Sequence, residues 1–102
     1  MDNRFAKTIR SRLADLREAD EAYGKAQDHL AKARHRQAAK WYEHAADLYR
    51  GCGLGLVAKK SYAAAAESYE HVEDADGCER CGLRAKSLPV YWDESCQDAK
   101  WG

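Results

Sequence analysis

Four cysteines are the residues of this chain with the broadest chemistry. Cys78 and Cys81 have the separation with which paired thiolates bind zinc. Two further thiols, Cys52 and Cys96, could complete a tetrahedral four-sulfur site. Because a second pair with this spacing is missing, buried or free thiols are the favoured interpretation. We therefore expect no cofactor, and we keep as an alternative a zinc-stabilised regulatory or scaffold protein that uses the four cysteines.

Two Glu-His pairs supply the residue types of general acid and base catalysis. They are Glu43-His44 and Glu70-His71. Adjacent residues on a helix point about 100° apart, so the two side chains of a pair do not face each other. No nucleophile, phosphate-binding loop or carboxylate cluster accompanies the pairs. A redox use of the paired cysteines is also disfavoured, because no alternation of strands and helices surrounds them. We therefore expect a protein that is not an enzyme.

Charge is distributed unevenly along the chain. The 102 residues include 17 basic and 17 acidic residues, but residues 1–60 hold 13 basic and 8 acidic residues, while residues 61–102 hold 4 and 9. A neutral total argues against a dedicated nucleic-acid-binding protein, which needs a strongly basic surface. The basic half alone leaves a nucleic-acid-binding regulator as an alternative. The candidate binding residues in that half are Arg10, Arg17, Lys32, Arg36 and Lys40.

Helices must position these side chains. Alanine is abundant, β-branched residues are scarce and the only proline is Pro89, so helix propensity is high over most of residues 3–88. Apolar residues recur at steps of three, four or seven and predict helices over about 3–33, 36–50, 54–73 and 77–88. Glycines around Cys52 end the second helix, and Asp76 is the expected N-cap of the fourth. The first apolar stripe consists of Phe5, Ile9, Leu13, Leu16, Tyr23 and Leu30.

Alanine and tyrosine alternate in two further stripes in the middle of the chain. The two stripes are Ala38, Tyr42, Ala45, Tyr49 and Cys52, and Ala58, Tyr62, Ala65, Tyr69 and Val72. Residues 38–44 also correspond to residues 65–71, and Cys52-Gly53-Leu54 corresponds to Cys81-Gly82-Leu83. The chain therefore contains an internal helix-turn duplication with a period of about 27 to 29 residues, which is typical of stacked helical units that bury a stripe only against each other.

A helix-pair pattern occupies residues 22–50. Small Ala26 in a first helix is followed at a characteristic distance by Ala38, Tyr42 and Ala45 in a second. In these positions the segment resembles a tetratricopeptide repeat. The resemblance implies an antiparallel helix pair and a groove that recognises a peptide or a partner helix, which is a binding role.

The last segment, residues 89–102, is a short aromatic tail. It contains Trp92 and Trp101, which either dock the tail onto the helices or form an exposed aromatic patch that anchors a partner. We include both tryptophans among the candidate binding residues.

These observations predict one all-α domain over residues 1–88, a small antiparallel bundle of three to four helices with tetratricopeptide-like packing. The expected function is that of a non-enzymatic protein–protein interaction module, an adaptor or an inhibitor. It would bind a larger protein through a helical surface with a basic N-terminal and an acidic C-terminal half. The same charge asymmetry would support a homodimer. No apolar run is long enough for a signal peptide or a membrane span, so we expect a cytoplasmic location and no membrane partner.

Overall fold

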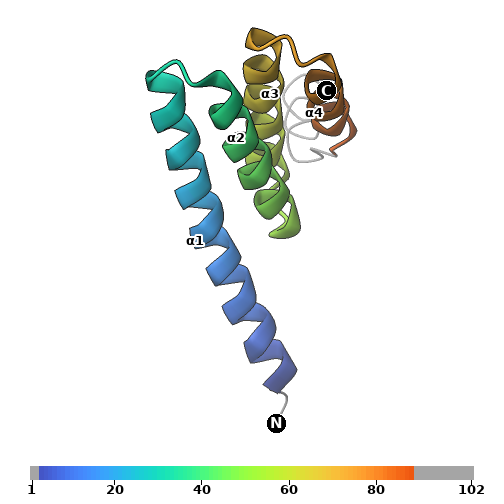
Figure 1. Cartoon of the computed structure of the whole chain (residues 1–102). Helices are drawn as coiled ribbons and strands as arrows, with labels where there is room; N and C mark the ends of the chain where they lie inside the picture. The colour runs from blue at the N-terminus through green and yellow to red at the C-terminus, as the bar shows by residue number, and fades with distance from the viewer. Residues whose placement is uncertain (1–2, 89–102) are drawn as a thin grey trace, which may run out of the picture.

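Four α-helices follow one another along the chain (Figure 1). A computed structural model describes the backbone of residues 3–88 and the side chains of residues 12–88. The helices are α1 (Asn3–Ala31), α2 (His35–Gly51), α3 (Gly55–His71) and α4 (Ala75–Ser87). Each helix packs against the next one in sequence, and short turns make neighbouring helices antiparallel. The prediction of a small all-α bundle is confirmed, with each helix boundary within two residues of its predicted position. Among the helices described, none offers a stretch long and apolar enough to span a bilayer.

One turn conformation occurs three times. The first three helices end at Ala31, Gly51 and His71, a spacing of 20 residues. After each end, a backbone N–H donates to the carbonyl five residues earlier, from Arg34 to His29, from Leu54 to Tyr49 and from Asp74 to Tyr69. The preceding residue is left-handed in every case, with φ of 58° at Ala33, 80° at Gly53 and 57° at Glu73. This is the Schellman pattern, which satisfies carbonyls at a helix C-terminus.

The structural period of 20 residues corrects the predicted period of about 27 to 29. With an offset of 27, Tyr42 in the middle of α2 corresponds to Tyr69 in the last turn of α3, and these places are not equivalent. With an offset of 20, Tyr42 corresponds to Tyr62 and Tyr49 corresponds to Tyr69, and all four are buried. The reason is that α2 and α3 each have 17 residues, and a three-residue turn separates one helix from the next.

Tyrosine rings and alanines build the core. Both predicted alanine and tyrosine stripes are buried on α2 and α3, but their last members, Cys52 and Val72, lie in the turns after these helices and are half-buried. In α1, however, the buried residues are Ala19, Ala22 and Ala26, while Leu13 and Leu30 of the predicted first stripe are exposed. Small alanines let α2 approach α1 closely, whereas larger side chains at these positions would hold the two helices apart. The large apolar residues of α1 therefore lie beside its contact with α2.

The start of α4 is set by Asp74 and not by the predicted Asp76. The Asp74 side chain accepts a hydrogen bond from the backbone N–H of Gly77 at 3.0 Å, which is the N-cap arrangement. The Schellman turn explains the shift, because it ends the previous helix at His71 and leaves Asp74 at the cap position. Gly77 also packs directly against the Tyr69 side chain of α3. A Cβ at this position would lie 2.7 Å from the Tyr69 ring.

The N-terminal part of α1 extends beyond its partner helix. The 29 residues of α1 correspond to roughly 43 Å at 1.5 Å per residue, whereas the 17 residues of α2 correspond to roughly 26 Å. The Cys52 thiol, just after α2, lies 3.7 Å from the carbonyl oxygen of Arg12. The α1 backbone before Arg12 therefore continues past the end of α2, as Figure 1 shows.

Candidate functional site

Two adjacent residues of α2 point to different sides of the helix array. Tyr42 lies near Tyr23 of α1 and Glu67 of α3; its pKa is raised by burial first and then by these two neighbours. Glu43 accepts hydrogen bonds from α3 and α4 instead. The chemistry of the two sides therefore has to be described separately.

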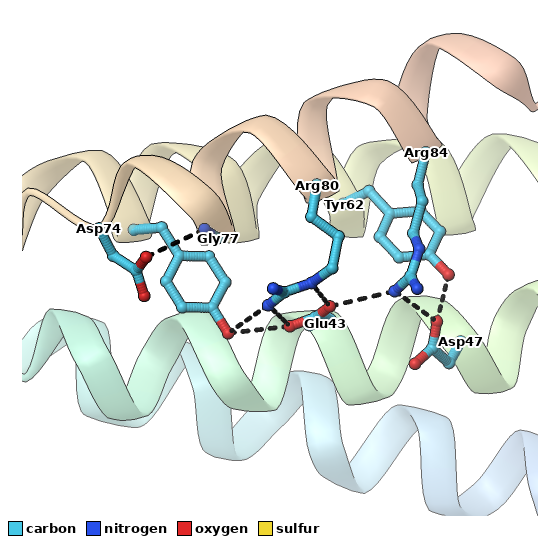
Figure 2. A network of polar contacts seen from close by, with 8 residues as sticks. Glu43, Asp47, Tyr62, Asp74, Gly77, Arg80 and Arg84 are labelled. Atoms are coloured by element: carbon cyan, nitrogen blue, oxygen red, sulfur yellow. Dashed lines mark hydrogen bonds and ion pairs between the residues drawn. The ribbon is translucent and has the colours of Figure 1, made fainter.

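On the side of α2 that faces α4, one carboxylate accepts four hydrogen bonds (Figure 2). Glu43 accepts from the Tyr69 hydroxyl at 2.8 Å, from Nε and Nη2 of Arg80 at 2.8 and 2.9 Å, and from Nη1 of Arg84 at 3.1 Å. The Glu43 side chain is only 15% exposed. Its pKa is lowered, chiefly by the hydrogen bond from Arg80. We call these four residues the clamp, because charge-assisted hydrogen bonds join α2, α3 and α4 through them.

Other tyrosine hydroxyls in the core donate to carboxylates of the preceding helix. Tyr49 of α2 donates to Asp20 of α1, and Tyr62 of α3 donates to Asp47 of α2. Burial, reinforced by the neighbouring carboxylates, raises the pKa of Tyr62 and of Tyr69 to about 12. These phenols are therefore neutral hydrogen-bond donors at neutral pH and serve the packing of the helices.

The opposite side of α2 carries a cleft between α1 and α3. The cleft has a volume of about 70 Å³ and is lined in part by Leu30 of α1, Tyr42 of α2, and Ala64 and Ser68 of α3. Tyr23 of α1 meets the Tyr42 ring edge to face, with ring centroids 5.4 Å apart. The polar contacts of α1 with other elements, for the side chains described, go to α2 or to the turn after it. Among the described side chains, no network of hydrogen bonds comparable to the clamp therefore joins α1 to α3 across the cleft.

Two acidic hollows continue the cleft toward the turn between α3 and α4. The first, of about 430 Å³, shares Glu67 and His71 with the cleft and is also lined by Glu70 and Glu73. The second, of about 580 Å³, is lined by Glu70, Glu73, Asp74, Ala75, Cys78 and Glu79. We call the cleft and the two hollows together the acidic groove. Carboxylates around an apolar floor create a negative potential that attracts cationic groups.

Two stacked histidines border this groove. His35 begins α2 and His71 ends α3, and their rings stack with centroids 4.3 Å apart and an interplanar angle of 15°. Nδ1 of His35 and Nδ1 of His29 are buried, and neither has a hydrogen-bond partner among the described residues. Ring packing therefore positions His35 at this end of the array.

The four-sulfur site that the sequence left as an alternative is not assembled from the cysteines whose positions are known. Cys52 lies beside α1, Cys78 lines the acidic groove and Cys81 is fully buried. No three His, Cys, Asp or Glu side chains gather into a metal-binding group in the described part of the chain. Burial first, and then Glu43, raises the pKa of Cys81 to about 12, so that this thiol is protonated and a poor nucleophile. Cys96 lies outside the described residues.

The other predicted binding residues are spread over α1, α2 and the turn between them. Arg17, Lys32, Arg36 and Lys40 are all exposed. Lys32 is paired with Asp28 of α1 at 3.4 Å. The side chain of Arg10 and the whole of Trp92 and Trp101 lie outside the part of the chain that the structure describes.

The sequence analysis missed both the clamp and the acidic groove. The clamp joins residues 26 to 41 positions apart, so spacing within one helix gives no sign of it. A signal for the groove was present, since Glu67, Glu70 and Glu73 recur every three residues, which within the predicted helix over about 54–73 would place them on one side. The structure adds the apolar floor beside them. Comparison of the chain with protein-family models, with curated proteins and with solved structures finds no match.

Proposed function

We propose that this protein is a non-enzymatic protein–protein interaction module, an adaptor or an inhibitor, that binds a larger protein through the acidic groove. The observation that carries the proposal is the continuity of the groove, whose three parts share Glu67, His71, Glu70 and Glu73. Carboxylates next to an apolar cleft are the complement of a basic amphipathic segment. The tetratricopeptide resemblance of residues 22–50 supports the same role, because it implies a groove for a peptide or a partner helix. We also place the protein in the cytoplasm, where thiols stay reduced.

A partner segment would use two kinds of contact. An apolar side chain would enter the cleft above Tyr42, beside Leu30, which is 40% exposed. Lysine or arginine residues one turn apart would reach Glu67 and Glu70, which are also about one turn apart on α3. The apolar contact supplies affinity, and the charges favour a fast and oriented encounter.

A designed peptide tests the proposal directly. The probe is an 18-residue amphipathic helix of leucine, alanine and lysine with a fluorescent label, and its control carries glutamate in place of lysine. Fluorescence anisotropy should detect binding of the basic peptide only. The double variant Glu67→Lys, Glu70→Lys should weaken it by roughly tenfold or more.

A matched variant separates the groove from the overall charge of the protein. Asp15→Lys combined with Asp76→Lys changes the net charge equally at exposed positions that do not line the groove. This control should bind the basic peptide nearly as well as the wild type at 0.15 M salt. Equal loss in both double variants, or no binding by the wild type, would refute the proposal. Oligonucleotide binding that falls steeply with salt would instead favour the nucleic-acid-binding regulator.

A further inference from the structure

The large apolar residues of α1 form a stripe that α2 leaves uncovered. Leu13 is 57% exposed and Leu30 is 40% exposed, while Leu16 and Tyr23 between them are half-buried. Leu30 lines the cleft, and Tyr23 contacts Tyr42 on the cleft floor. The stripe therefore runs along the side of α1 that borders the acidic groove and continues toward the N-terminus.

The sequence continues the same stripe where α1 extends past α2. Phe5 and Ile9 precede Leu13 at intervals of four residues. Residues 3–13 contain four basic residues and no acidic residue, the basic ones being Arg4, Lys7, Arg10 and Arg12. This segment is a helix in the structure. It therefore has the chemistry of the basic amphipathic helix that the acidic groove fits.

We propose that a second copy of this chain supplies that helix, so that the N-terminal part of α1 from each copy lies in the acidic groove of the other. This inference rests on the proposed function, since it names an occupant for the same groove. In the dimer, the basic residues of one copy approach Glu67, Glu70 and Glu73 of the other. A larger partner protein would then bind by displacing the second copy.

Symmetry and register support a closed dimer. If the two α1 helices run antiparallel and are centred between Leu16 and Ala19, residue 5 of one copy meets Leu30 of the other and Leu13 comes close to Tyr23. The same pairing occurs twice because the interface is two-fold, and no surface is left over for further copies.

Sedimentation equilibrium of the 102-residue chain tests this inference, because it measures the mass of the protein in solution. The protein concentration should range from about 5 to about 500 µM, which spans the dissociation constants of ordinary weak dimers. The wild type should be dimeric. Leu13→Glu should raise the dimer dissociation constant by roughly a hundredfold or more, because each dimer loses two apolar contacts and gains two carboxylates. Ala14→Glu is the matched control, since Ala14 is exposed and points about 100° away from Leu13. It should remain dimeric.

Two further readouts make the outcome specific. Both substituted positions are exposed, so circular dichroism should show unchanged helicity in both variants, and unchanged thermal stability at protein concentrations below the dissociation constant of the wild-type dimer. Glu67→Lys combined with Glu70→Lys should also dissociate the dimer. A wild type that is monomeric at every concentration, equal effects of Leu13→Glu and Ala14→Glu, or a dimer that is insensitive to the two groove substitutions would each overturn the inference. The proposed function is judged separately, because the basic probe peptide should still bind the monomeric Leu13→Glu variant.

Discussion

Replacing Glu43 with glutamine is the sharpest perturbation of the fold, because it removes one charge and keeps the shape of the side chain. Glu43 accepts three hydrogen bonds from two guanidinium groups and one from the Tyr69 hydroxyl. Hydrogen bonds to charged groups contribute about 1.5–3 kcal/mol each when they are well shielded. The Arg80 and Arg84 side chains are 43% and 38% exposed, so water replaces part of the hydrogen bonding that these guanidinium groups lose when the carboxylate is removed.

The expected loss is therefore about 2 kcal/mol in the free energy of unfolding. For a domain of this size, that loss lowers the melting temperature by about 10 °C. Urea unfolding followed by circular dichroism at neutral pH measures it. Glu21→Gln is the control, because Glu21 is exposed, does not line the acidic groove and belongs to no ion pair among the described residues. Its effect should stay within about 0.5 kcal/mol.

The pH dependence gives a second test of the same substitution. The pKa of Glu43 is lowered in the folded protein, so its contribution to stability is present above the unfolded pKa of about 4.3 and is lost as pH falls through the folded pKa. The difference between wild type and Glu43→Gln should accordingly shrink as pH falls from neutral toward 3. A difference of less than about 0.5 kcal/mol at pH 7, or one that is equally large at acid pH, would refute the account of the clamp.

Three other measurements test particular contacts. In thermal unfolding, Gly77→Ala should destabilise the fold by about 1–3 kcal/mol, because its Cβ would lie 2.7 Å from the Tyr69 ring. Gly82→Ala in the same helix should stabilise the fold by about 1 kcal/mol, because its Cβ would meet no atom within 4 Å. The pKa of Tyr69 is raised to about 12 in the folded protein, so its contribution to the free energy of unfolding is present below about pH 10 and is lost as pH rises toward 12. Urea titrations over this pH range should therefore show a smaller loss of stability in Tyr69→Phe than in the wild type. Iodoacetamide should alkylate Cys78 in the folded protein and should not modify the buried Cys81 until the chain unfolds. Peptide mass spectrometry measures the modification of each thiol, and equal modification of both would contradict the burial of Cys81.

The helices could be predicted from the sequence because local rules determine them. Stripes such as Ala38, Tyr42 and Ala45 give the period, and the glycines around Cys52 mark a helix end. The third turn was harder to locate, because Glu73 rather than glycine adopts the left-handed conformation there. The same turn moved the cap of α4 from the predicted Asp76 to Asp74.

Properties that depend on pairs of helices were not predictable in the same way. Hydrophobicity favoured the large residues of α1 as its packing face, but close approach of α2 selects alanines such as Ala22. The internal repeat was misjudged because identities such as Glu43-His44 with Glu70-His71 outweighed the weaker but structurally correct spacing of the tyrosines. The partners of Glu43 lie on two other helices, and no single-helix pattern encodes them.

The clamp also bears on the order of events during folding. Since each helix packs mainly on its neighbour in sequence, most contacts close short loops, which favours fast folding. The bonds from Arg80 and Arg84 to Glu43 are different, because they span 37 and 41 residues and need α2, α3 and α4 to be in place already. We expect these bonds to form after the rate-limiting step, so that weakening them accelerates unfolding and leaves the folding rate nearly unchanged. The clamp would then act mainly on how long the folded molecule persists.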